Sequence, residues 1–201
     1  MNPEIGSIIP FGEYKWRVLD VQGSEALLIT EEVIEQRNYN EQYTDVTWET
    51  CDLRKYLNGE FLRKFTQEQQ GRIVEKKIPN SKNRWYSTKG GNDTRDKIFL
   101  LSLEEVDKYF GDSGDYLNKR KKEITNAYFI VLSYYLSNSY DSDRVANYGS
   151  EGACWWWLRS PGAASNSAAK VGEDGDVLVG GAMVNFDDNG CGVRPALWLK
   201  V

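Results

Sequence analysis

The sequence predicts an α+β fold in one domain over residues 1–201. Strand-like patterns near the start give way to helical patterns in the middle, and short strand-like segments return near the end. In a doubly wound sheet, strands and helices would alternate instead. With 40% hydrophobic and 13% aromatic residues, the 201-residue chain can bury one good core.

The first element expected is a β-hairpin over residues 14–34, YKWRVLDVQGSEALLITEEVI. Trp16, Val18 and Val21 alternate with Arg17 and Asp20, as in a half-buried strand. The letters QGSE supply the turn, and ALLIT reads as the buried return strand. Residues 38–50, which are polar and aromatic, are expected to form a loop with exposed rings.

A helix follows over residues 50–65, TCDLRKYLNGEFLRKF. Its apolar face, at helical spacing, consists of Leu53, Tyr56, Leu57 and Phe61. Thr50 or Asp52 is the expected cap. The Asn58-Gly59 pair inside the pattern predicts a break or a second short helix.

Two capping boxes mark further helices. Thr66 is followed three residues later by Gln69, and Ser102 by Glu105. The letters KIFLLS before the second box predict a short buried strand. By composition, residues 80–96, 111–123 and 141–153 are loops, whereas residues 125–139 form an apolar helix or strand whose β-branched and aromatic residues favour strand.

The last 47 residues contain five short strand patterns: WWWLRS, AAKVGE, DVLVGG, AMVNF and GVRPALWLKV. Their spacing, set by glycines and prolines, predicts a meander of short antiparallel strands. In such a strand Trp155 and Trp157 share one face and Trp156 takes the other. Either one face exposes indole at a recognition surface, or helices and loops cover both faces.

Composition excludes several classes of function. The chain has no histidine, which removes Ser-His-Asp and Cys-His catalysis and every His-ligated metal centre. Its net charge of −5 gives no general attraction for nucleic acid. No apolar run is long enough to span a membrane, and no signal peptide is visible. Location stays open between the cytoplasm and display within a larger assembly.

Acidic residues and cysteines are the remaining candidates for chemistry. The letters EDGD and FDDNG gather carboxylates that could bind calcium, but Asp and Asn are also ordinary turn residues, and no segment fits a calcium loop. KGGNDT lacks the spacing of a phosphate-binding loop. Cys51, Cys154 and Cys191 contain no CxxC motif and favour structural thiols, although a nearby Arg159 or Arg194 could activate one of the last two. No metal and no cofactor are expected.

Six segments, in order, resemble a bacterial and phage family of domains without an assigned activity (DUF6273-like): IPFGEYKWRVLD, ALLITEEVI, TWETCDLRKYLNGEF, DKIFLLSLEEVDKYF, WWWLRSPG and GCGVRPALWL. The closing pattern is also similar to the end of C-type lectin-like domains of the formylglycine-generating-enzyme type and to variable proteins of diversity-generating retroelements. This resemblance implies a C-type lectin-like fold, with a twisted antiparallel sheet, two main helices and long loops.

The same resemblance divides the segment 155–201 into scaffold and binding face. The scaffold positions are Trp157, Leu158, Arg159, Ser160, Val193, Arg194, Pro195 and Ala196, and both arginines should make buried hydrogen bonds to carbonyls or carboxylates. The predicted ligand-binding positions are Trp155, Trp156, Asn166, Lys170, Glu173, Asp174, Asp176, Asn185, Asp187 and Asp188. The EPN, QPD and WND motifs of calcium-dependent sugar binding are absent.

The expected function is therefore a non-enzymatic binding or display module for a protein or glycan ligand, with the oligomeric state left open. One alternative is a copper/thiol oxidoreductase of the formylglycine-generating type that uses Cys154 or Cys191, although neither cysteine has the matching sequence context. Another is a purely structural domain of a surface or phage assembly.

Overall fold

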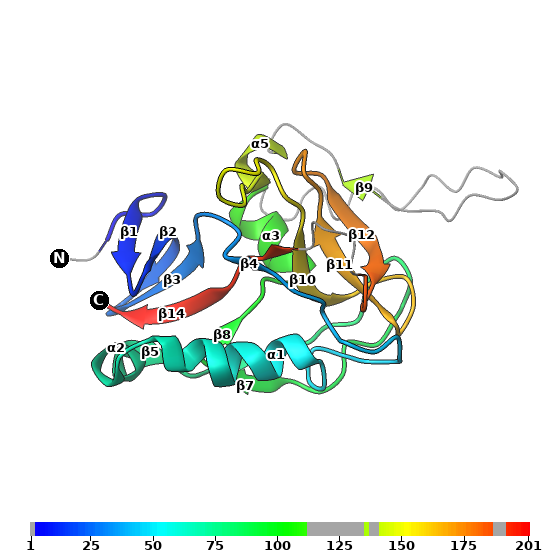
Figure 1. Ribbon diagram of the computed structural model, residues 1–201, viewed down its shortest axis with the longest axis horizontal. Helices are drawn as coiled ribbons and strands as arrows, with labels where there is room; N and C mark the ends of the chain where they lie inside the picture. The colour runs from blue at the N-terminus through cyan, green and yellow to red at the C-terminus, as the bar shows by residue number, and fades with distance from the viewer. Residues whose placement is uncertain (1–2, 112–134, 137–140, 187–191) are drawn as a thin grey trace, which may run out of the picture.

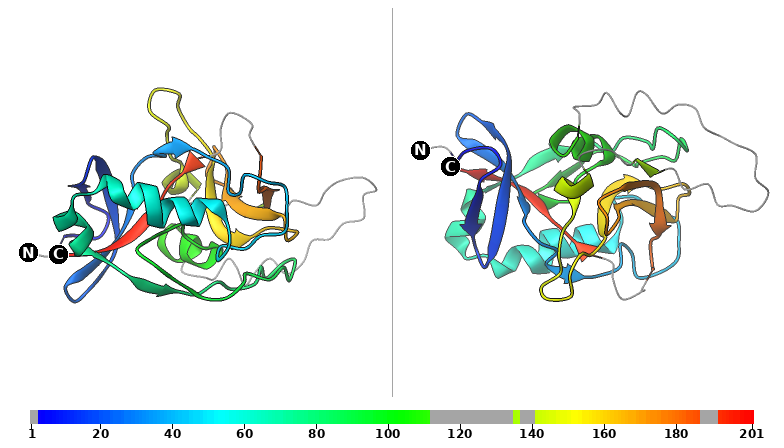
Figure 2. Two further views of the ribbon diagram at one scale, coloured as in Figure 1. Left: turned by 60° about the horizontal axis from the view of Figure 1, so that its bottom comes forward. Right: turned by 90° about the horizontal axis from the view of Figure 1, so that it is seen from above.

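The computed structural model describes residues 3–111, 135–136, 141–186 and 192–201. It is an α+β fold, as predicted, with two main helices and mostly antiparallel sheets. Figure 1 shows one sheet near the two chain ends and a second sheet on the far side, with α1 and α2 running along the lower edge. The two further views in Figure 2 show the same separation of the sheets.

The first sheet contains strands from both ends of the chain. Its strands are β1 (Ile8–Phe11), β2 (Tyr14–Gln22), β3 (Glu25–Thr30), β14 (Ala196–Lys200) and β5 (Ile73–Val74), in that order, and β8 (Ile98–Phe99) also pairs with β14. The predicted hairpin is confirmed as β2 and β3. Its register shifts between Val18 and Asp20, and Leu19 is buried there together with Val18.

The second sheet is formed largely by the tail. Its order is β4 (Glu35–Gln36), β13 (Gly192–Val193), β10 (Trp156–Pro161), β11 (Ser167–Val171), β12 (Val177–Met183) and β9 (Tyr135–Leu136). The predicted antiparallel meander is confirmed for β10, β11 and β12, whereas β13 pairs with β10 in parallel.

The tail differs from prediction in two places. DVLVGG and the first two residues of AMVNF join in a single strand, β12, which starts at Val177. Gly181 takes a φ of +67° in an irregularity of the ladder and does not end the strand. GVRPALWLKV divides into β13 and β14, which lie in different sheets. Pro195 stands at this crossing, where its carbonyl accepts the Thr30 N–H at 3.0 Å.

The helix predicted over residues 50–65 is confirmed, but its details differ. It runs as α1 (Asp52–Tyr56), a π-helical turn η1 (Leu57–Phe61) and a 3-10 turn η2 (Leu62–Lys64), so Asn58-Gly59 does not break it. The Asn58 amide instead binds the backbone of Lys97 and Ile98 and fixes β8 against the helix. The cap is Cys51, whose sulfur accepts the Arg54 N–H at 3.4 Å.

Both predicted capping boxes are present. They start α2 (Gln67–Arg72) and α3 (Leu103–Tyr109), each with the two reciprocal hydrogen bonds of the motif. The loop predicted over residues 80–96 is confirmed except at its end, where β7 (Thr94–Asp96) pairs with β6 (Lys76–Ile78) in a two-stranded sheet. Asn83 is buried in that loop and donates to the carbonyls of Pro161 and Val179, which ties the loop to the second sheet.

Three loop predictions need comment. The rings of residues 38–50 were expected at the surface, which is confirmed for Tyr43. Tyr39 and Trp48 are instead buried, and the Trp48 indole donates to Asp96 at 2.9 Å. Residues 141–153 contain the short helix α5 (Asp141–Arg144). The predictions for residues 111–123 and 125–139 lie outside the described residues, apart from position 111 and the backbone of β9.

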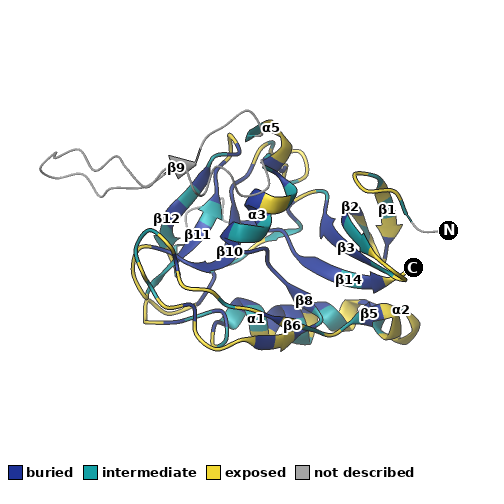
Figure 3. Cartoon of the chain, turned by 180° about the vertical axis from the view of Figure 1, so that it is seen from behind, coloured by how far each residue is buried: buried dark blue, intermediate teal, exposed yellow. Residues whose placement is uncertain are grey.

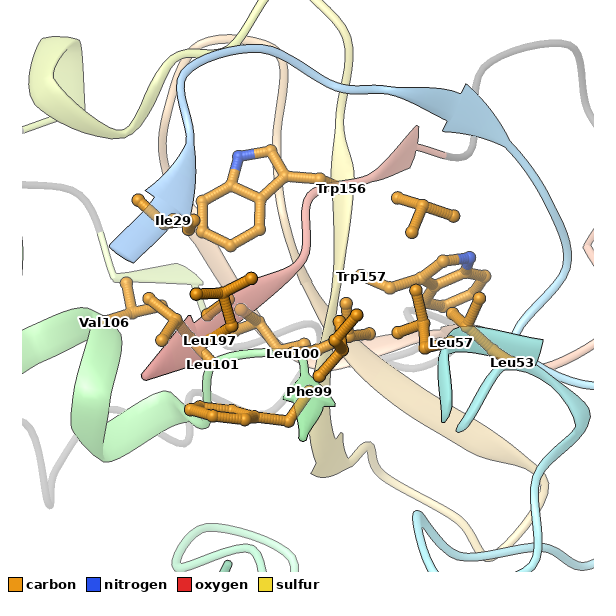
Figure 4. Packing of buried hydrophobic residues seen from close by; sticks show 14 of the residues in the cluster. Ile29, Leu53, Leu57, Phe99, Leu100, Leu101, Val106, Trp156, Trp157 and Leu197 are labelled. Carbon is orange, nitrogen blue, oxygen red and sulfur yellow. The ribbon is translucent and has the colours of Figure 1, made fainter. Parts of the chain in front are cut away.

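The three consecutive tryptophans lie in the core. The exposed fraction is 7% for Trp155 and 0% for both Trp156 and Trp157, so of the two alternatives the one with both faces of the strand covered is confirmed. In Figure 4, Trp156 lies toward Ile29 and Trp157 beside Leu53 and Leu57. One face of β10 is thus covered by the first sheet and the other by the α1 helix. Strand β10 is buried along its whole length (Figure 3).

Candidate ligand-binding site

Two buried arginines hold the tail in place, as predicted. Arg159 donates to the carbonyls of Leu100 and Pro79, at 2.7 and 3.3 Å, and pairs with the Glu105 carboxylate. Arg194 donates to three carbonyls, those of Thr30, Glu31 and Arg144, at 2.9 to 3.2 Å. Burial lowers the pKa of Arg194 to about 10.

The turn between β11 and β12 is anchored from outside. Gly175 has a φ of +86°, and a Cβ there would lie 1.8 Å from the Asp141 carbonyl oxygen. The buried Arg144 donates through Nε to the Gly175 carbonyl at 2.6 Å and also pairs with Asp141. Only glycine fits this close approach, so α5 sets the position of the turn that carries the predicted carboxylates.

A hollow of about 350 Å³ opens beside this turn. We call it the Trp155 hollow, and its lining residues are Trp155, Lys170, Gly172, Glu173, Asp174, Asp176 and Leu178. Five of the predicted ligand-binding residues therefore meet in one place. They come from the residue just before β10, from β11 and from the turn that follows it, which is where the family resemblance placed the binding face.

The floor of the Trp155 hollow is the Trp155 ring, which is covered by the Lys170 side chain. The Lys170 ammonium lies 3.9 Å from the centre of the Trp155 ring, a cation–π contact. Trp155 meets Trp157 edge to face, with 4.8 Å between ring centres, and Phe186 lies 6.3 Å from Trp155. Packing against Trp157 fixes the Trp155 ring, so the aromatic floor is part of the rigid core.

Two carboxyl groups on the rim influence each other. Burial raises the pKa of Asp176 to about 7, and the hydrogen bond and charge of Asp174 add to the shift. The pKa of Asp174 is lowered, chiefly by its side-chain hydrogen bond with Asp176. Near neutral pH the pair therefore binds and releases one shared proton, and the charge of the rim changes with pH.

The other predicted site residues lie elsewhere. Trp156 is fully buried and donates its indole N–H to the Arg144 carbonyl, so it belongs to the scaffold and not to a binding face. Asn166 precedes β11, at the opposite end of that strand from the turn. Asn185 does not line the hollow, although its neighbour Phe186 contacts Trp155. The predictions for Asp187, Asp188 and Cys191 fall outside the described residues.

Sequence reasoning missed several contributors. Leu178 lines the hollow because it lies directly across from Lys170 on β12. Arg144 was not singled out, since nothing in the letters DSDR indicates that its guanidinium reaches the distant Gly175. The sequence did offer one signal for the anchored turn: the glycine within EDGD, a residue that favours the left-handed conformation found there.

Thiols and metal ligands complete the inventory of reactive groups. Cys51 is fully buried, and burial raises its pKa to about 12, so it is an inert structural thiol. Cys154 is buried and its sulfur contacts the Trp155 carbonyl at 3.3 Å. Across the part of the chain that the structure describes, no three Cys, Asp or Glu side chains are grouped to hold a metal ion. In the same residues, no helix is both long and apolar enough to cross a membrane.

No curated protein and no solved structure matches the chain significantly. A family model, described as a domain of unknown function, does match it over residues 23–201. That range includes β3, both main helices and all strands of the tail. The chain therefore belongs to the DUF6273 family.

Proposed function

We propose that this chain is a non-enzymatic binding module with a C-type lectin-like fold, whose Trp155 hollow meets a protein or glycan ligand. The observation that carries the proposal is the meeting of Trp155, Lys170 and three carboxyl groups in one hollow. Carboxylates accept hydrogen bonds from hydroxyl, amide and cationic groups, which are the donors that proteins and sugars present.

The rigidity of the surroundings supports this proposal. The aromatic floor rests on buried Trp157, and the turn is fixed by Arg144 through Gly175. A site whose groups are already held in place loses little entropy on binding, so a small hollow can bind usefully. Glu173 and Asp174 on the rim are exposed, and variation there leaves the packed residues untouched.

The arrangement of the chain supports the finer fold assignment. Strand β14 returns from the tail to lie between β3 and β5, so segments from the two ends of the chain share a sheet. The tail forms most of a second sheet, and the chain crosses between the two sheets at residues 31–34 and 194–195. A C-type lectin-like domain combines the same parts, with a binding surface on the second sheet and its loops.

A comparison of ligand capture by two matched variants tests the function. A glycan array and a displayed peptide library would be probed with the wild-type chain, with Glu173→Ala/Asp174→Ala, and with the control Glu60→Ala/Glu68→Ala. The control carboxylates are exposed on the helical side of the molecule, away from the hollow. We expect ligands that the wild type and the control retain and the first variant loses. Ligands kept equally by all three proteins would contradict the site.

The diversity-generating-retroelement hypothesis has its own test, which is genomic. A near-copy of the segment encoding residues 155–201, differing at adenines and lying beside a reverse transcriptase gene, would identify a diversified receptor. We expect the differing codons to include those of Glu173 and Asp174. If the neighbouring DNA holds no such copy, the face is fixed and one specific ligand should be sought.

A further inference from the structure

A second hollow lies where the chain leaves the first sheet after β3, and it is independent of the proposed function. Its volume is about 370 Å³. The start of β2, the connection that runs from β3 to β4 (Figure 1), and the turn at residues 148–149 form its walls. We call it the tyrosine hollow, and the residues that matter here are Glu13, Tyr14, Lys15, Thr30, Glu32 and Tyr148.

The charged groups of the tyrosine hollow lack partners. Among the described residues, the exposed side chains of Glu13, Lys15 and Glu32 make no hydrogen bond and no ion pair with another residue. The adjacent Arg17 and Glu31, in contrast, form a two-point pair, with one of the two bonds at 2.8 Å. Carboxylates outnumber the ammonium two to one around the hollow, which favours a cationic ligand over an anionic one.

The two phenol rings differ in how they are held. Tyr14 packs against Phe61, with 5.5 Å between ring centres, and meets Trp16 edge to face at 6.3 Å, so its ring is fixed by the core. Burial raises the pKa of Tyr14, which keeps the phenol neutral. Tyr148 is half-buried and starts a turn in which its N–H donates to the Gly152 carbonyl at 2.8 Å. Faces of neutral aromatic rings attract cations.

An unused acceptor lies in the inner wall. Thr30 is 1% exposed, and its hydroxyl oxygen has no hydrogen-bond partner among the described residues. A buried hydroxyl without a partner destabilises the fold, and a valine would fill the same space without this loss of stability. Thr30 lines the hollow, and rotation about its χ1 turns the hydroxyl oxygen toward a ligand there.

We propose that the tyrosine hollow binds a small ligand through a protonated amine. Glu13 and Glu32 supply the opposite charge, and the rings of Tyr14 and Tyr148 supply aromatic surface for the ammonium and its carbon chain. The Thr30 hydroxyl accepts one of the three N–H bonds that an ammonium must place. Combined carboxylate and aromatic contacts select an amine over a neutral group of the same shape.

Three probes of one size test the charge selectivity: butylammonium, 1-butanol and butyrate. Backbone amide signals of the ¹⁵N-labelled full chain would be followed while each probe is added. We expect saturable shifts at Thr30, Val33 and Gly149 with butylammonium alone. Four outcomes would each overturn the proposal. Butylammonium and butanol could give equal responses, or butyrate could bind in their place. No probe could give a saturable response, or the shifts could be confined to Trp155 and Lys170.

Variants then assign the groups. Glu13→Gln/Glu32→Gln should weaken butylammonium binding about fivefold, since each carboxylate contributes as an exposed ion pair. Thr30→Val should weaken it about threefold, while its melting temperature stays equal or rises because an unpaired buried hydroxyl is removed. Glu68→Gln is the control: this exposed residue of α2 lines neither hollow, and the variant should bind as the wild type does. Unchanged affinity in both test variants would refute the assignment.

Discussion

Strand β10 and the turn between β11 and β12 belong to one sheet, yet they meet their surroundings differently. Every residue of β10 is buried, and Arg159 within it bonds to three separate segments of the chain. In the turn, Glu173 and Asp174 are exposed, and the Asp174 carboxylate accepts the N–H of Asp176, two residues away. Long-range bonds through its side chains make β10 a determinant of the fold. In the turn the distant Arg144 holds the backbone at Gly175, which leaves the side chains of Glu173 and Asp174 free to vary in chemistry.

Trp157→Ala gives the largest expected effect. Its ring is fully buried, lies 5.7 Å from the Tyr39 ring centre, and donates its indole N–H to the Arg37 carbonyl at 3.1 Å. Loss of the ring should lower the free energy of unfolding by roughly 3–5 kcal/mol, measured by urea denaturation. A cost under about 1 kcal/mol would mean that β10 is no more constrained than the turn.

Arg194→Met should be the next most costly change. The methionine fills part of the same volume but removes the donor from the carbonyls of Thr30 and Glu31, while the Arg144 carbonyl keeps only the Trp156 indole. We expect a loss of roughly 2–4 kcal/mol, read from the same urea curves. Arg194→Lys is the matched control: it keeps the charge but not the planar fork, and should recover only part of the loss. Full recovery by lysine would show that charge, not geometry, is what the site needs.

A pH-dependent effect of intermediate size is expected at Asp176. Its pKa is raised to about 7 in the folded chain from a usual value of 3.8, chiefly by burial. The unfolded chain therefore releases this proton first, and Asp176 loses its stabilising contribution as pH rises from about 4 to about 7. Asp174 has a lowered pKa, so its contribution to the free energy of unfolding is lost as pH falls, at pH values below that range.

Asp176→Asn tests this assignment. The variant cannot ionise, so it should match the wild type near pH 4 and exceed its stability at pH 8. The gain should be about 1 kcal/mol, because partial exposure screens the carboxylate. Thermal melts at several pH values give the difference. A gain that is the same at both ends of the range would show that ionisation is not its cause.

The smallest effect on stability is expected for Glu173→Ala/Asp174→Ala. Both side chains are exposed, and the turn keeps its glycine and its bond to Arg144. The free energy of unfolding should change by less than about 0.5 kcal/mol, while capture of the ligand of the Trp155 hollow is lost. Loss of folding in this variant would show that the rim residues stabilise the fold as the scaffold residues do.

Much of the fold could be predicted because its signals are local. A hairpin reveals itself by alternation, and the helices starting after Thr66 and Ser102 by their capping boxes. The carboxylates of EDGD also proved to share one hollow, since a hairpin turn keeps sequence neighbours together. These features depend on residues a few positions apart.

The burial of the tryptophans could not be predicted, because it depends on partners far away in the chain. Alternation places Trp156 and Trp157 on opposite faces correctly, but it does not say what covers each face. Ile29 and the α1 helix do so, from segments more than one hundred residues earlier (Figure 4). The unpartnered hydroxyl of Thr30 escaped notice for the same reason: the letters ALLIT indicate only a buried strand.

The position of β14 has a consequence for how the chain is made. Ala196 pairs with Ile29, about 170 positions earlier, and the same short strand also pairs with β5 and β8. While the ribosome is still synthesising the tail, three strands wait without their common neighbour and expose apolar edges. A chain stalled before residue 196 would expose those edges to chaperones and proteases. Protection from both therefore depends on synthesis of β14.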